Sequence, residues 1–167
     1  MAQWAFRPVR LPVRDVGIAV AKLSVPVATI ARMKATGTFS VTSFVPTEVV
    51  PDPPVGTALP VGVAHIVKEF EGEITGRAAT LFTSAFDQDS GTGTYVAMES
   101  FEGALNGNAG SFNFAHSATT SGTDRTAEFF TIVPASGTGA LAGITGTGGL
   151  SVDADGGHHI WFDYELG

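Results

Sequence analysis

The sequence predicts an all-β protein built on a single antiparallel, eight-stranded, up-and-down barrel. From Thr36 onward, short runs of β-branched and aromatic residues are separated by glycines, and 20 of the 21 glycines follow residue 34. No window has a sustained apolar period of 3.6 residues, which excludes long helices. Several short strands at regular spacing are typical of a sandwich or barrel, and eight strands are enough to close a small barrel.

In chain order, we expect strands at residues 36–45, 61–71, 74–86, 93–105, 108–120, 124–133, 139–152 and 158–166. Five of the nine prolines fall between the first two strands, in the interval 46–60. Proline cannot join a central ladder, so this interval is predicted to be a long connection. It is either a lid over a barrel mouth or a solvated crossover, and both alternatives stay open.

An internal repeat indicates a meander of similar hairpins. FEGEITG at 70–76 aligns with FEGALNG at 101–107, an offset of 31 residues, and a looser copy lies at 139–143. Asn106-Gly107 is a strong hairpin signal, because both central residues of a type I′ turn need positive φ. With that two-residue turn, Phe101 faces Phe112 and Glu99 faces Phe114. A turn at Gly107-Asn108 would change the partners but not the faces.

Alternation along these two strands places one set of side chains toward the core. We predict that the inward face carries Tyr95, Ala97, Glu99, Phe101, Phe112, Phe114 and His116. The repeat aligns Lys68 with Glu99, so Lys68 is also expected to point inward. Burying an unpaired carboxylate is costly, so Glu99 must be paired, hydrated or shifted in pKa.

Two interpretations of this interior are open. In the structural one, Lys68 and Glu99 form an ion pair beside a hydrogen-bonded histidine. In the functional one, Glu99 and His116 are a catalytic acid–base pair, and the pKa of Glu99 rises in an apolar cavity toward that of His116. The residues expected to contact a ligand are then Tyr95, Lys68, Phe101, Phe112 and Phe114.

The outer face is expected to be unusually apolar. It is predicted to carry Val67, Phe82, Phe86, Val96 and Met98, which favours a homo-oligomer, a dimer or a trimer. If the two faces are inverted, Phe82 and Phe86 belong to the core, and Lys68 and Glu99 are ordinary surface charges.

Charge divides the chain into two parts. Residues 1–34 hold six of the nine Lys and Arg residues and one of the sixteen acidic residues, a net charge of +5, which leaves −12 on residues 35–167. The strong negative charge of residues 35–167 repels nucleic acid. No apolar run in the sequence is long enough to span a membrane. We expect residues 1–33 to be a disordered or loosely attached basic extension of a barrel at 34–167.

The same extension has two other interpretations, a targeting segment or a natural translation start at Met33. Its longest apolar run, 16–21, makes only a marginal secretory signal, and we expect a cytoplasmic protein.

Other motifs give little support for a cofactor or a metal, and neither is expected. GTGALA at 137–142 fits a dinucleotide-binding pattern, but the glycines that follow do not favour the helix it requires. His158 and His159 are adjacent, so on a strand their rings point to opposite faces. The chain has no cysteine and no G-x-S-x-G motif, so nucleophilic acyl chemistry has no support.

Several segments in order resemble a bacterial family known as domain of unknown function 3224. They are ATGTFSVTSF at 35–44, KEFEG at 68–72, ESFEG at 99–103, GSF at 110–112, HS at 116–117, VP at 133–134, GTG and LAG within 137–143, and DYEL at 163–166. That family is similar to the allene-oxide-cyclase-like barrels of the calycin type, which include plant dirigent proteins. The resemblance implies a closed barrel with a cavity, often oligomeric, and assigns no reaction.

The sequence therefore predicts a small-molecule-binding barrel whose apolar cavity takes a lipid-like or polyketide-like ligand. One alternative is a cofactor-free isomerase or cyclase that uses Glu99 and His116. Another is a structural or interaction protein whose barrel is simply filled.

Overall fold

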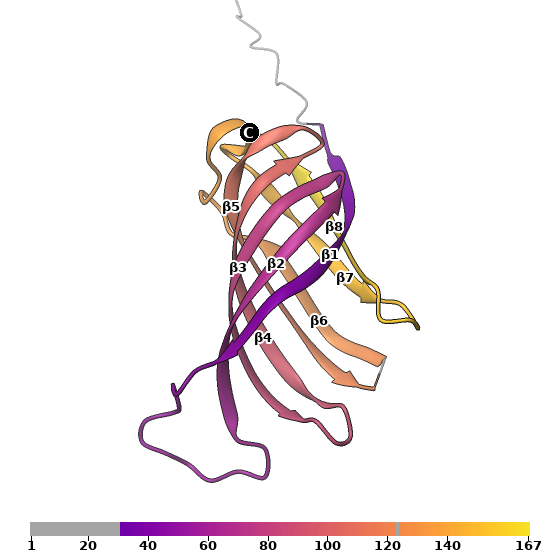
Figure 1. The fold of residues 1–167 in the computed structure, drawn as a ribbon. Coiled ribbons are helices and arrows are strands. Elements are labelled where there is room, and N and C mark those ends of the chain that lie inside the picture. The colour runs from indigo at the N-terminus through magenta and orange to yellow at the C-terminus, as the bar shows by residue number, and fades with distance from the viewer. Residues whose placement is uncertain (1–30, 123) are drawn as a thin grey trace, which may run out of the picture.

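The computed structural model describes residues 31–122 and 124–167, which form eight antiparallel strands (Figure 1). The strands are β1 (Met33–Pro46), β2 (Val61–Gly72), β3 (Ile74–Asp87), β4 (Thr92–Leu105), β5 (Asn108–Ser121), β6 (Asp124–Ile132), β7 (Thr145–Val152) and β8 (His158–Glu165). Their number and order confirm the predicted all-β fold. The proline-rich interval is the exposed connection between β1 and β2.

The strands form a nearly closed barrel. Their order in the sheet is β6-β5-β4-β3-β2-β1-β8-β7, so each strand lies beside its neighbour in sequence, and β8 returns to pair with β1. The edge strands β6 and β7 lie side by side without a backbone ladder. Thr147 Oγ1 of β7 donates a hydrogen bond of 2.8 Å to the Phe130 carbonyl of β6, which joins the two edges.

The expected strand at 139–152 is wrong at its start. Gly139–Leu141 is a short 3₁₀ turn, and β7 begins at Thr145. Gly139 and Gly143 have φ of 58° and 75°, left-handed values that do not fit a strand ladder. This segment instead closes one end of the barrel, because the side chains of Leu141 and Ile144 are fully buried there.

The hairpin of β4 and β5 has the predicted register. Leu105 pairs with Asn108 across the Asn106-Gly107 turn, Phe101 pairs with Phe112, and Glu99 pairs with Phe114. Both turn residues have positive φ, 49° and 81°, as a type I′ turn requires. Ala97, Glu99, Phe101, Phe112, Phe114 and His116 are all buried, which confirms the predicted inward face.

The two ends of the barrel differ. The closed end, uppermost in Figure 1, holds the Asn106-Gly107 turn and the buried segment around Leu141. The open end, lowermost in the figure, holds the β1–β2, β3–β4 and β5–β6 connections. Between them, the interior is filled by an aromatic cluster that includes Phe39, Phe70, Phe101, Phe112, Phe114 and Phe162.

The predicted basic extension lies almost entirely outside the described residues. Met33, its last residue, already belongs to β1 and pairs with Tyr164 of β8. Within residues 31–122 and 124–167, no helix has the length and the hydropathy that a bilayer span requires.

Candidate functional site

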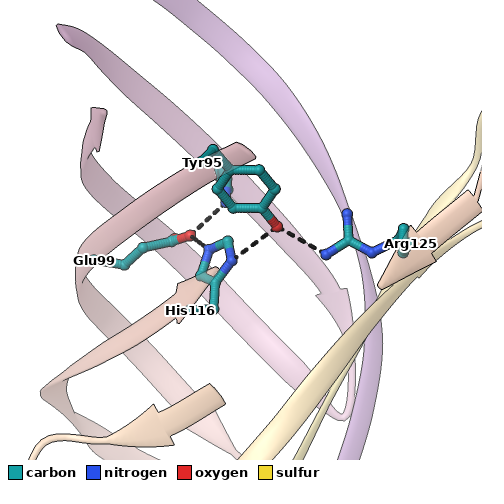
Figure 2. A network of polar contacts seen from close by, with 5 residues as sticks. Tyr95, Glu99, His116 and Arg125 are labelled. Atoms are coloured by element: carbon teal, nitrogen blue, oxygen red, sulfur yellow. Dashed lines mark hydrogen bonds and ion pairs between the residues drawn. The ribbon is translucent and has the colours of Figure 1, made fainter. Parts of the chain in front are cut away.

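Three of the predicted site residues meet inside the barrel. Lys68 of β2, Glu99 of β4 and His116 of β5 are 6%, 0% and 3% exposed. Oε1 of Glu99 accepts hydrogen bonds from Lys68 Nζ and, at 2.6 Å, from His116 Nε2 (Figure 2). The ion pair and the hydrogen-bonded histidine of the structural interpretation are thus both present. A carboxylate and an ammonium group this deeply buried are stable only when paired in this way.

The contacts continue from His116 toward the open end. Tyr95 Oη lies 3.1 Å from His116 Nδ1, and Arg125 Nη2 donates a hydrogen bond of 2.8 Å to Tyr95 Oη. Arginine can only donate, so the phenolic proton of Tyr95 remains available for His116 Nδ1. His116 is then neutral and carries its proton on Nε2, which donates to Glu99. We call Lys68, Tyr95, Glu99, His116 and Arg125 the interior network.

The pKa of Glu99 is lowered, opposite to the shift expected for an acid–base pair. Burial by itself would raise this pKa, but the His116 hydrogen bond and the Lys68 charge outweigh burial and stabilise the carboxylate. Burial, together with the charges of Lys68 and Arg125, lowers the pKa of His116 more than the neighbouring Glu99 raises it. Burial raises the pKa of Tyr95 despite the adjacent Arg125. The network therefore holds an ionised Glu99, a neutral His116 and a protonated Tyr95 near neutral pH.

One buried polar atom of the network and one beside it lack hydrogen-bond partners in the described part of the chain. Glu99 Oε2 and Thr80 Oγ1 have no hydrogen-bond partner among the described residues. They belong to cross-strand neighbours of β3 and β4. Glu99 thus keeps one acceptor oxygen unused, while its other oxygen binds both Lys68 and His116.

A cavity of about 620 Å³ lies at the open end, and we call it the mouth cavity. Its lining includes Phe44, Phe82, Ser84, Phe86, Tyr95 and Thr120. The rings of Phe82 and Tyr95 are stacked at 5.1 Å, and Phe44 meets Phe82 edge-on at 6.2 Å. Tyr95 therefore belongs to both the interior network and the cavity wall. A second hollow, of about 820 Å³, is lined mostly by small residues together with Arg77 and Glu102, and it shares no residue with the mouth cavity or the interior network.

The prediction that Phe82 and Phe86 lie on the outer face is wrong. Phe82 pairs with the buried Ala97, and Phe86 with Gly93, so both belong to the inward set of β3. The error arises at the β2–β3 turn. Phe70 pairs with Gly76 across five residues, whereas two residues separate Leu105 from Asn108. A turn with an odd number of residues reverses the relation between the two faces.

The remaining predicted ligand contacts lie deeper in the barrel. Phe101, Phe112 and Phe114 are fully buried and pack against one another and against Phe162, with ring centroids 5.0–6.1 Å apart. None of the three lines the mouth cavity. They form a packed layer between the interior network and the closed end.

Sequence reasoning missed Phe44 and Arg125 because each follows a one-residue register shift. The β1–β2 pairing shifts between Val41 and Ser43, and the β5–β6 pairing shifts between Ser117 and Thr119. Each shift exchanges the two faces of a strand, so Phe44 and Arg125 point inward where strict alternation would point them outward. The sequence carries no glycine at either position to signal the bulge.

The adjacent histidines point to opposite faces, as their spacing predicts. His158 packs inward with its ring 4.8 Å from that of Phe39, while Nε2 of His159 lies 2.6 Å from Asp153 Oδ2 at the surface. Burial, and then the charges of Lys68 and Arg125, lower the pKa of His158. Within the described part of the chain, no group of three or more His, Cys, Asp or Glu side chains is placed to hold a metal ion.

Comparison with known proteins identifies the family. The family model described as a protein of unknown function, DUF3224, matches residues 35–164. The crystal structure of a DUF3224 protein of unknown function from Shewanella oneidensis MR-1, at 1.84 Å resolution, is 30% identical, with a TM-score of 0.67. The match covers 82% of this chain and 99% of that one. No curated protein matches the chain. The chain therefore belongs to the DUF3224 family.

Proposed function

We propose that this barrel binds a small, largely apolar molecule, lipid-like or polyketide-like, in the mouth cavity. One observation carries the proposal: an aromatic cavity of about 620 Å³ opens at one end of a barrel that is otherwise packed. Ligand sites are typically concave, about 300–1,000 Å³ in volume, and apolar with a few convergent polar groups. Here Tyr95 is such a polar group, and the stacked Phe82 is its apolar neighbour.

The interior network supports this role by fixing Tyr95. The hydroxyl of Tyr95 is held between Arg125 and His116, and His116 is held by Glu99. The packed layer of Phe101, Phe112 and Phe114 stops a ligand from passing deeper. In this proposal Glu99, His116 and Lys68 position the wall of the cavity and do not touch the ligand.

A cofactor-free isomerase or cyclase is the second candidate, and one observation favours it. The hydrogen-bonded chain joins the Tyr95 hydroxyl at the cavity to His116 and Glu99 inside the barrel. Proton transfer to or from a bound molecule would then pass through Tyr95. The lowered pKa of Glu99 disfavours this carboxyl as the proton donor.

Native mass spectrometry of freshly purified protein, followed by solvent extraction, tests the binding proposal. We expect a recurrent small molecule that is lost in Phe82→Ala and kept in Leu81→Ala. Leu81 is the preceding residue of β3, and its side chain is on the outer face and 56% exposed. If the molecule is lost during purification, added apolar aromatic compounds should bind the wild type and Leu81→Ala but not Phe82→Ala. Equal binding by the two variants would contradict the proposal, as would no binding by the wild type.

Tyr95→Phe separates the two candidates, because it keeps the ring and removes the hydroxyl. Binding without reaction predicts the same extracted molecule in a smaller amount. Catalysis predicts a different molecule, the unreacted substrate, bound to the variant.

We also propose that the outer face of β3–β6 binds a second copy of this chain. Leu81, Val96, Met98 and Phe129 are 48–58% exposed there. Two cross-strand rows contain these apolar side chains, Leu81–Met98–Ala115 and Thr83–Val96–Ser117–Phe129, and neither row contains a charged residue. In so acidic a chain, an uncharged face is where two copies can meet with the least repulsion.

A further inference from the structure

Arg125 is placed in the barrel interior by a local distortion of β6. Phe130 pairs with His116, and Phe129 with Ser117, but beyond the shift Thr126 pairs with Thr119, and Arg125 with Thr120. Thr120 lines the mouth cavity. If the pairing of β5 and β6 continued without the shift, Arg125 would point toward solvent, because successive side chains of a strand alternate between its two faces.

The distortion strains the backbone. Ala127, at the shift, has φ of 48°, in the left-handed region that a residue with a Cβ seldom adopts. Bulges of this kind are common near functional sites, where they redirect a side chain. The strain at Ala127 accompanies an arginine turned into an apolar, aromatic environment.

The contacts of Arg125 leave part of its guanidinium unused. Nη2 donates to Tyr95 Oη at 2.8 Å, and Nε donates to Glu128 at 3.4 Å. The carboxylate of Glu128 is 45% exposed, so this long contact neutralises the arginine only weakly. The Nη1 group takes part in neither bond, and the Arg125 side chain is itself 16% exposed at the open end.

The lining of the mouth cavity has aromatic faces and no acidic side chain, and Arg125 lies directly behind it, bonded to the Tyr95 hydroxyl of its wall. Arg125 itself lines a neighbouring hollow together with Glu128. Phe44, Phe82, Phe86 and Tyr95 supply the faces, and the guanidinium lies 5.7 Å from the Tyr95 ring. Glu99, the acid of the interior network, already accepts from Lys68 and His116 on one oxygen. A guanidinium beside stacked rings suits a flat molecule with an anionic group at its edge.

We infer that the mouth cavity selects a planar aromatic anion, such as an aromatic carboxylate or sulfonate, and that Arg125 binds its anionic group. The inference rests on the proposed binding function and adds the chemical class of the ligand. The rings of the ligand lie against Phe82 and Phe86, and the anion accepts hydrogen bonds from the guanidinium.

Two fluorescent dyes with the same ring system test the inference. 8-Anilinonaphthalene-1-sulfonate carries the anion, and N-phenyl-1-naphthylamine lacks it. We expect the wild type to bind one molecule of the sulfonate per chain about tenfold more tightly than the neutral dye, the scale of a charge-assisted hydrogen bond. Arg125→Gln should abolish this preference by weakening the sulfonate alone, and Arg125→Lys should keep part of it. Phe82→Ala should weaken both dyes.

Arg77→Gln is the matched control, because it removes the same charge from the outer face, where the Arg77 side chain is 71% exposed. An equal loss of sulfonate binding in Arg77→Gln and Arg125→Gln would overturn the inference, because net charge would then explain it. Equal affinities for the two dyes, both sensitive to Phe82→Ala, would overturn the anion preference and leave the binding function standing. No binding of either dye would overturn both. Thermal melts of each variant establish that it is folded.

Discussion

Replacing Lys68 with methionine should destabilise the barrel far more than replacing an exposed arginine does. Methionine fills a similar volume but leaves Glu99, which is 0% exposed, with His116 as its remaining partner. Removing one member of a buried ion pair costs about 3–5 kcal/mol, because the other charge stays buried and uncompensated. This loss is a large share of the roughly 5–15 kcal/mol that stabilises a typical domain.

Urea denaturation followed by circular dichroism at pH 7 measures this loss as a change in the free energy of unfolding. The double variant Lys68→Met with Glu99→Gln should cost less than the sum of the two single variants, by about 2 kcal/mol of coupling. Arg77 and Glu102 supply the control pair, because they form an ion pair between two strands, β3 and β4, but are 71% and 72% exposed. The coupling of this exposed pair should stay below about 1 kcal/mol.

A small loss of unfolding free energy in Lys68→Met would refute the reasoning. If Lys68→Met cost less than about 1 kcal/mol with an unchanged m-value, Glu99 could not be the buried, ionised partner that its surroundings imply. If the buried and exposed cycles gave equal coupling, burial would not be strengthening the interaction. Either result would remove the basis for a network that fixes Tyr95.

Three further predictions follow from the same structure. Because the folded chain lowers the pKa of both His116 and Glu99, the unfolded chain binds more protons, so the free energy of unfolding should fall as the pH drops from 7 and fall further below 4.5. His116→Gln should flatten the upper part of this profile without abolishing it, because the pKa of His158 is also lowered; an unchanged slope would contradict the assignment. Met98→Glu should shift the protein to a smaller species in analytical ultracentrifugation, whereas Ser151→Glu on the exposed face of β7 should not. Gly107→Ala should cost about 1 kcal/mol in urea denaturation, because nothing within 4 Å obstructs the added methyl group and the positive φ alone is unfavourable.

The sequence predicted what depends on local turn chemistry and strict alternation. The Asn106-Gly107 turn sets the register of β4 and β5, and from that register the burial of Glu99 and His116 followed. The placement of Lys68 rested on the internal repeat and is confirmed by its contact with Glu99. The inference for β4 and β5 succeeded because a two-residue turn determines which face of each strand points inward.

The same reasoning failed where the chain inserts or omits one residue. The β2–β3 turn has an odd number of residues, which reversed the expected face of Phe82. The shifts in β1 and β6 depend on how each strand fits its neighbours around the barrel, which no local motif records. The raised pKa of Glu99 in the functional interpretation is also wrong, because His116 and Lys68, the partners of the structural interpretation, converge on one oxygen and stabilise the carboxylate.

The two register shifts that interrupt the alternation of side chains indicate which end of the barrel binds a ligand. Both one-residue shifts lie toward the open end. One brings Phe44 into the lining of the mouth cavity, and the other brings Arg125 behind that lining, where it bonds to Tyr95. A barrel that needed only a packed interior could continue β6 in register and leave Arg125 in water, where its charge costs nothing to solvate. This chain instead adopts a left-handed Ala127 and partly buries a guanidinium beside aromatic rings. Ala135, near the closed end, is also left-handed, so the backbone strain is not special to the mouth. The partly buried guanidinium is the feature that favours a mouth that binds a ligand over a barrel that is simply filled.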